Sequence, residues 1–196
     1  MHSRRLASFL LGLWLGSGVF MAWVASENFA TVDRLLAQPA PAATLRIKML
    51  GKDEARLLLR YEASEQNRTY FEVWETVQVV LGAVFFFFLL FGTTEGKIAL
   101  SLALVLVVLV LVQRFVLTPE LQAIGKLLDF TGPFAMSGER GKFRVVHTSY
   151  VIVEVGKWAI QLVLAAILVA RGRGRSGNAG QQFNVVDKAD HRHINR

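Results

Sequence analysis

Long apolar runs alternate with charged segments along the chain, and this pattern predicts helices that cross a membrane. Four runs stand out, at residues 6–25, 72–92, 97–117 and 149–170. A helix needs ~20 apolar residues to cross the hydrocarbon core of a bilayer. The second run, which contains four consecutive phenylalanines, falls short of this length on its own. We therefore expect Tyr70–Glu75 to complete it at the membrane surface.

The first run has a second interpretation as a secretory signal peptide, since Val24-Ala25-Ser26 resembles a cleavage site. Its apolar stretch is longer than the ~7–15 residues of a signal sequence, so we favour a retained helix. Small residues recur every four positions on one face of this run. Gly12 and Gly16 among them form a GxxxG pattern, which lets another helix approach closely. The alternative is that glycine is simply common in membrane helices.

The segments between the runs carry helical signals of their own. Lys52–Trp74 contains neither Gly nor Pro and repeats its apolar and acidic residues at helical spacing, so it is expected to continue into the second span. Pro119 before Glu120–Leu128 predicts either the first turn of a helix or a kink in an extended one. Gln38–Ala43, with two prolines, is expected to be a linker. The tail 172–196, rich in Gly, Arg, Asn and His, is expected to be disordered.

The predicted fold is therefore all-α: an integral membrane four-helix bundle over residues 1–171, with helical extensions outside the bilayer. Four crossings place both termini on one side. That side carries Arg4, Arg5, Lys97 and the cluster of arginines after residue 170, which the positive-inside rule assigns to the cytoplasm. Residues 26–75 then form a long helical loop on the non-cytoplasmic side. We expect a multi-pass protein of the cell inner (plasma) membrane.

Composition supports the membrane class and narrows the partners. Of the 196 residues, 53% are hydrophobic, and the formal net charge is +7. In a membrane protein such a positive excess meets anionic lipid, and no basic motif interleaved with aromatics indicates nucleic acid. Cysteine is absent, which excludes disulfides and thiolate metal sites. The expected partners are the lipid bilayer and other membrane proteins or further copies of the chain.

A polar stripe runs along the last apolar run. Charge inside hydrocarbon costs at least ~2.5–3.5 kcal/mol, so we expect these side chains to face the bundle. Glu154 and Lys157 lie three residues apart and can pair along the helix, which is sufficient by itself to explain why they are tolerated. On an ideal helix the stripe spans an arc of about 80° and comprises His147, Tyr150, Glu154, Lys157 and Gln161.

Polar residues on the other spans are expected at the same end of the bundle. They include Gln78 near the start of the second span and Gln113 near the end of the third. We predict an ion-pair network between spans two, three and four. It acts either as a structural clamp or as a path for protons or ions, and we favour the clamp. Its members are Glu75, Arg114, Glu154 and Lys157, with Glu72 as a further partner.

No catalytic residue, metal site or cofactor is predicted. Haem ligation by two histidines would need a second membrane histidine, whereas only His147 borders a span. His191 and His193 could bind a metal weakly, but a mobile tail is the simpler interpretation. The chain also lacks the GxSxG, HExxH and phosphate-loop patterns of common enzymes.

Two stretches resemble a known family. Residues Phe9–Phe20 resemble the first span of the transmembrane protein 205-like domain family (the bacterial domain of unknown function 4149). The run Phe143-Arg144-Val145-Val146-His147, which leads into the span with Glu154, is similar to the entry of that family's last span. The resemblance extends over Leu6–Arg171 and implies a four-helix integral membrane protein, with a longer Ser26–Trp74 insertion. A weaker likeness to four-helix membrane oxidoreductases and copper-resistance proteins lacks their paired histidines.

Three functions are compatible with these patterns. We expect a non-enzymatic helical bundle that scaffolds or binds other membrane proteins. The alternative is a small proton- or ion-coupled transporter that uses Glu154 and Lys157, and the third is a four-helix membrane oxidoreductase with a lipid-soluble or haem-like substrate. A polar, solvent-filled cavity around Glu154 would favour transport, whereas a dry, paired network would favour the scaffold.

The predicted orientation can be tested directly. Single cysteines introduced between Ser26 and Glu75 should react with a membrane-impermeant thiol reagent added to the non-cytoplasmic face, because the native chain has no cysteine to interfere. Cysteines introduced at the turn before Lys97 serve as the opposite-side control. Labelling of the 26–75 positions from the cytoplasmic face alone would reverse the topology.

Overall fold

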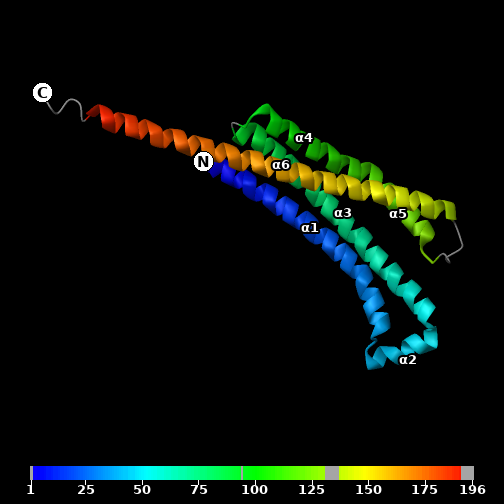
Figure 1. The fold of residues 1–196 in the computed structure, drawn as a ribbon. Helices are drawn as coiled ribbons and strands as arrows, with labels where there is room; N and C mark the ends of the chain where they lie inside the picture. Colours follow the sequence, from blue (N-terminus) through cyan, green and yellow to red (C-terminus); the bar gives the residue numbers. More distant parts are fainter. Residues whose placement is uncertain (1, 94, 131–136, 191–196) are drawn as a thin grey trace.

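The computed structural model describes residues 2–93, 95–130 and 137–190, with side chains from Ser3 to Ala170 except that of Ser137. These residues are almost entirely helical, and the helices form an elongated bundle (Figure 1). Four helical stretches are long and apolar enough to cross a membrane, which confirms the predicted all-α class. The elements are α1 (His2–Ala37), α2 (Pro41–Leu50), α3 (Lys52–Gly92), α4 (Lys97–Val112), a π-helical turn η1 (Gln113–Leu117), α5 (Thr118–Leu128) and α6 (Ser137–Asp190).

The four long helices alternate in direction. α1 packs against α3 and α6, and α4 packs against the same two helices from the other side. α2 joins α1 to α3 at one end of the bundle, here named the α2 end, and α5 with the start of α6 lies toward the same end (Figure 1). Each long helix therefore contributes one stretch to the apolar part of the bundle and one stretch to the α2 end.

α1 and α3 are much longer than a bilayer crossing requires. Their 36 and 41 residues correspond to about 54 and 62 Å, against a hydrocarbon core of ~30 Å. α3 is continuous, as predicted from the absence of Gly and Pro between Lys52 and Trp74. The predicted linker Gln38–Ala43 is wrong in its second half, because Pro41 begins α2. Proline suits a first helical turn, where its missing N–H removes no hydrogen bond.

The third long helix contains a wide turn just before its proline. α4 runs directly through η1 into α5, so Pro119 lies within an extended helix, the second of the two predicted arrangements. A proline has no N–H to donate and its ring displaces the carbonyl four residues earlier, here that of Phe115. The π-helical turn over Gln113–Leu117 accommodates this misfit, as such turns do inside α-helices.

Two separate apolar clusters hold the helices together. The larger fills the bundle away from the α2 end and contains Leu11, Trp14, Phe85, Leu106 and Leu164 among its buried members. The smaller joins the α1 and α3 extensions and is built from Val32, Leu36, Ala55 and Ala63. The extension is therefore a packed helical hairpin with a core of its own.

Glycines allow close packing, but at other positions than predicted. An added Cβ at Gly12 or Gly16 would meet nothing within 4 Å, so no described helix of this chain approaches them. Their face points outward because Leu11 and Trp14 define the buried face of α1. Close approach occurs instead at Gly18, next to Trp158, and at Gly82, next to Trp14.

The C-terminal tail is only partly described. α6 continues to Asp190, but the side chains beyond Ala170 and residues 191–196 lie outside the described part. The arginine cluster that begins at Arg171, and the pair His191 and His193, fall there. The disordered tail therefore stays a prediction.

We predict that Gly82→Val lowers the melting temperature of the purified protein, whereas Gly12→Val leaves it nearly unchanged. A Cβ at Gly82 would lie 3.1 Å from Cη2 of Trp14 and 3.4 Å from Cγ2 of Val107. Overpacking of a filled core typically costs ~1–3 kcal/mol. Both positions are helical glycines, so the intrinsic effect of valine on the helix cancels in the comparison. Equal melting temperatures would contradict the tight α1–α3 contact.

Candidate functional site

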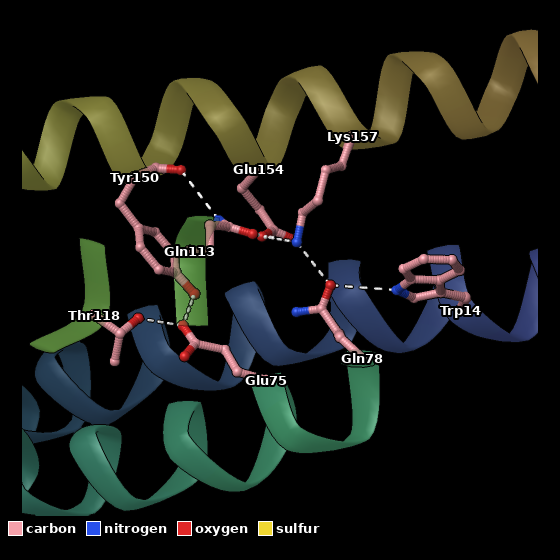
Figure 2. Close-up of polar contacts among 8 residues, drawn as sticks. All are labelled: Trp14, Glu75, Gln78, Gln113, Thr118, Tyr150, Glu154 and Lys157. Atoms are coloured by element: carbon pink, nitrogen blue, oxygen red, sulfur yellow. Dashed lines mark hydrogen bonds and ion pairs between the residues drawn. The ribbon is translucent and has the colours of Figure 1, made fainter. Parts of the chain in front are cut away.

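A layer of polar side chains crosses the bundle between the larger apolar cluster and the α2 end. Figure 2 shows that α1, α3, the η1–α5 segment and α6 all contribute to it. The members drawn there, here named the polar layer, are Trp14, Glu75, Gln78, Gln113, Thr118, Tyr150, Glu154 and Lys157.

Lys157 forms the centre of one half of the layer. Its side chain is only 1% exposed, and its Nζ lies 2.8 Å from Oε2 of Glu154, one helical turn earlier. The same ammonium donates to Oε1 of Gln78 on α3 at 2.6 Å. Trp14 Nε1 on α1 donates to that oxygen as well, at 3.2 Å. One buried charge thus connects three helices, and a buried charge needs such partners to offset its lost hydration.

Glu75 forms the centre of the other half and is fully buried. The hydroxyl of Tyr150 donates to its Oε1 at 3.0 Å, and the hydroxyl of Thr118 donates to the same oxygen. Its Oε2 has no hydrogen-bond partner among the described residues. Glu75 is therefore held by two hydroxyl donors from other helices and contacts no cationic side chain there.

Gln113 links the two halves. Its Nε2 donates to Oε2 of Glu154 at 3.1 Å and to the backbone carbonyl of Tyr150 at 3.5 Å. This side chain is fully buried and belongs to the π-helical turn, which widens the helix at that point. The turn thus delivers an amide to the layer and joins the third long helix to α6.

The predicted polar stripe on α6 is only partly turned toward the layer. Tyr150, Glu154 and Lys157 contact other members, and Gln161 is buried although its Oε1 has no partner among the described residues. His147 is exposed and stacks on Phe143, with ring centroids 5.9 Å apart. It lies outside the network because it precedes the level at which α6 meets η1.

Arg114 pairs with only one of its predicted partners, Glu72. Arg114 does not contact Glu75; its guanidinium faces Glu72, 3.6 Å away, and Glu72 is 59% exposed. The Arg114 side chain is 26% exposed and so lies nearer to the surface of the bundle than the fully buried Gln113. Its neighbour Gln113 takes the inner position. Both residues belong to the π-helical turn, in which Gln113 contacts the layer and Arg114 contacts Glu72.

Four layer members were not predicted as site residues: Trp14, Gln78, Gln113 and Thr118, of which Gln78 and Gln113 were expected only as polar residues at the same end of the bundle. Gln78 follows Glu75 by three positions and so shares its helix face, a signal that the sequence contains. Thr118 and Trp14 show no comparable signal, because their partners lie 43 and 64 positions away in the chain. Only the packing of the helices brings them to the layer.

A cavity of about 780 Å³ lies between the polar layer and the α2 end. We call this space the outer cavity. All four long helices contribute to its wall, the third of them through α5. Glu154 lies at the inner end of the cavity. Its Oε2 contacts Lys157 and Gln113 in the polar layer, and its Oε1 lies near Gly18. Nine aromatic residues line the wall: Phe29, Tyr61, Phe71, Trp74, Phe130, Phe143, His147, Tyr150 and Trp158.

Two contacts close the outer cavity along the side between α3 and α5. Tyr61 packs on Phe130 with ring centroids 4.8 Å apart. Arg68 forms an ion pair with Asp129 at 2.8 Å, and its other terminal nitrogen contacts Glu65. Asn28 and Asn67 join α1 to α3 behind this wall through a side-chain hydrogen bond of 2.6 Å. The cavity therefore has fixed walls formed by specific contacts.

Within the described residues, no three His, Cys, Asp or Glu side chains come together as a metal site. Comparison of the chain with family models, curated proteins and solved structures finds no match. The resemblance to the transmembrane protein 205-like domain family therefore stays a prediction.

We predict that Tyr150→Phe and Glu75→Gln are energetically coupled. Tyr150→Phe removes a buried donor, and Glu75→Gln replaces the carboxylate acceptor with a weaker neutral one; each change should destabilise the protein by up to about 1–3 kcal/mol, and the double variant should lose less than the sum. Tyr61→Phe is the control, because the Tyr61 hydroxyl makes no hydrogen bond within the described chain. Thermal unfolding in detergent measures all four variants. Strict additivity would show that the two side chains act independently.

Proposed function

We propose that the chain is a non-enzymatic protein of the inner (plasma) membrane, with both termini in the cytoplasm, that acts as a helical scaffold for other membrane proteins. The burial of the polar layer and the contacts that join its members across the helices support this role most directly. Lys157, Gln78, Gln113 and Glu75 are each at most 1% exposed. A path for ions would need these groups to reach water, whereas a clamp needs them to reach one another.

The layer is well suited to fix one arrangement of the helices. Hydrogen bonds and ion pairs are directional, so they hold only in one register of α1, α3 and α6, whereas apolar surfaces in lipid slide past one another at low cost. Removal of one partner from a buried ion pair typically costs ~3–5 kcal/mol, because the other charge is left without compensation. A scaffold with a defined shape benefits from such an all-or-none clamp.

A small ion- or proton-coupled transporter is the second candidate, and one observation favours it. Glu154 is 14% exposed and lines the outer cavity, so one carboxylate of the layer meets a space that extends toward the α2 end. The same carboxylate bonds Lys157 and Gln113. Protonation of Glu154 would weaken those contacts, and this is the step on which transport by this bundle would depend.

The two functions differ in what Lys157→Met and Glu154→Gln change. For a scaffold, we expect both variants to lower the folded yield and melting temperature, and proton or cation flux into liposomes to equal that of empty liposomes for every variant. Lys142→Met and Glu139→Gln are matched controls. In the wild type, Lys142 and Glu139 form an ion pair of the same i, i+3 spacing on α6. Their charged atoms lie 2.9 Å apart, and the Lys142 side chain is 66% exposed.

Exposed pairs contribute only ~0–1 kcal/mol, so the controls should leave the melting temperature nearly unchanged. Flux above the empty-liposome level in the wild type, lost in Glu154→Gln while folded yield is kept, would overturn the scaffold and support the transporter.

A further inference from the structure

The outer cavity is long and crosses the level at which the predicted spans end. On α3 its wall runs from Leu57 to Trp74, and on α6 from Phe143 to Trp158. At 1.5 Å per residue these stretches measure about 25 and 22 Å, whereas one leaflet contributes only ~15 Å of hydrocarbon. Since the second span is predicted to begin at residue 72, most of the α3 wall lies beyond the membrane surface.

Apolar side chains continue along the wall beyond that level, beside the polar Arg60, Ser64, Asn67 and Arg68. Leu57 and Tyr61 on α3, Phe29 on α1 and Phe130 after α5 all line this part of the cavity. A space filled only by water would gain nothing from such side chains, because exposed apolar surface is unfavourable in water. The wall instead continues the hydrocarbon environment of the leaflet toward the α2 end. Its volume lies within the ~300–1,000 Å³ typical of ligand sites.

The cavity is also accessible from the side of the bundle. Val151 and Val155 belong to its wall, yet they are 43% and 51% exposed, so this part of the wall borders the surroundings. Both valines fall in the predicted span 149–170 and therefore at the level of the hydrocarbon. A molecule could thus enter from the bilayer without crossing water.

Charge at the α2 end of the cavity is positive. Arg60 lines the cavity, is exposed, and makes no ion pair among the described residues. The other charged groups of the wall are compensated: Arg68 and Asp129 pair with each other, and Glu154 pairs with Lys157 at the inner end. An amphiphile with its apolar part toward the polar layer would therefore place its headgroup next to an uncompensated guanidinium.

We propose that the outer cavity binds one anionic phospholipid drawn part-way out of the adjacent leaflet. Its acyl chains lie along the aromatic wall, and its phosphate is bound by Arg60, whose planar guanidinium can donate two hydrogen bonds to it. This goes beyond the scaffold role, because neither the clamp nor the absence of ion flux requires a lipid ligand. The site would let the protein present a lifted lipid to a partner outside the membrane.

Native mass spectrometry of the delipidated full-length protein, titrated with phosphatidylglycerol in detergent, tests the proposal. We expect one retained lipid per chain. Leu57→Glu should weaken binding at least about tenfold, because it places a negative charge in the apolar wall beyond the membrane. Leu58→Glu is the matched control: the neighbouring leucine is similarly exposed, at 42% against 37%, but does not line the cavity.

The headgroup is tested in the same way. Arg60→Gln should weaken phosphatidylglycerol binding about tenfold, the loss expected for one charge-assisted contact, and weaken phosphatidylcholine binding less, because the choline ammonium already compensates the phosphate of that lipid. Arg46→Gln, on α2 and outside the cavity wall, should change neither lipid. The Arg60→Gln protein keeps the apolar wall, so this result stands even if Leu57→Glu fails to fold.

Three outcomes would overturn the proposal. Equal lipid retention by Leu57→Glu and Leu58→Glu would assign the bound lipid to the outer surface of the bundle. An equal loss of affinity for both lipids in Arg60→Gln would show that the cavity does not select an anionic headgroup. Binding of glycerol phosphate as tight as that of the whole lipid would show a free phosphate site instead. None of these results depends on the flux and yield measurements that test the scaffold.

Discussion

The burial of the Lys157 ammonium is the constraint on which the rest of the bundle depends. An ion without partners in a low-dielectric interior is unfavourable by several kcal/mol, so the surrounding helices must supply hydrogen-bond acceptors and a countercharge. Glu154 supplies the countercharge from the same helix, and Gln78 supplies an acceptor from α3. Trp14 and Gln113 then bond these two partners, which brings in α1 and the third long helix. One charge therefore links every span.

The polar layer also separates two kinds of interior. On one side the helices pack tightly: Trp14 packs against the ring of Phe85 and reaches into the space left at Gly82. On the other side the long helices surround the outer cavity, whose far rim is held by Tyr61 with Phe130 and Arg68 with Asp129. A rigid floor beneath an apolar cavity is the arrangement expected of a binding protein. Glu154 belongs to both, so occupancy of the cavity and stability of the layer can influence each other.

Local signals account for most of what could be predicted. The length of the apolar runs predicts four spans, and the absence of helix breakers between Lys52 and Trp74 predicts the long α3. The arc of polar residues on α6 correctly located Tyr150, Glu154 and Lys157 in the interior of the bundle. These predictions succeed because each depends on the periodicity of a single helix, which residue spacing determines.

Prediction failed where the relative rotation of two helices matters. The GxxxG pattern at Gly12 and Gly16 indicates a face that can pack closely, but not which way that face points, and here it points outward. Likewise Gln113 and Arg114 are adjacent in the chain, and the π-helical turn sends the amide inward and the guanidinium outward.

The sequence by itself determined the helices, their membrane-spanning length and the presence of charge within one of them. The tertiary structure decided which partners that charge has and where a cavity opens. The physical reason is that hydropathy and helical period are properties of short segments. The hydrogen bond between Trp14 and Gln78, which are 64 positions apart in the chain, depends instead on how α1 and α3 pack against each other. Hydrogen bonds across helices form only after that docking, and so no local pattern records them.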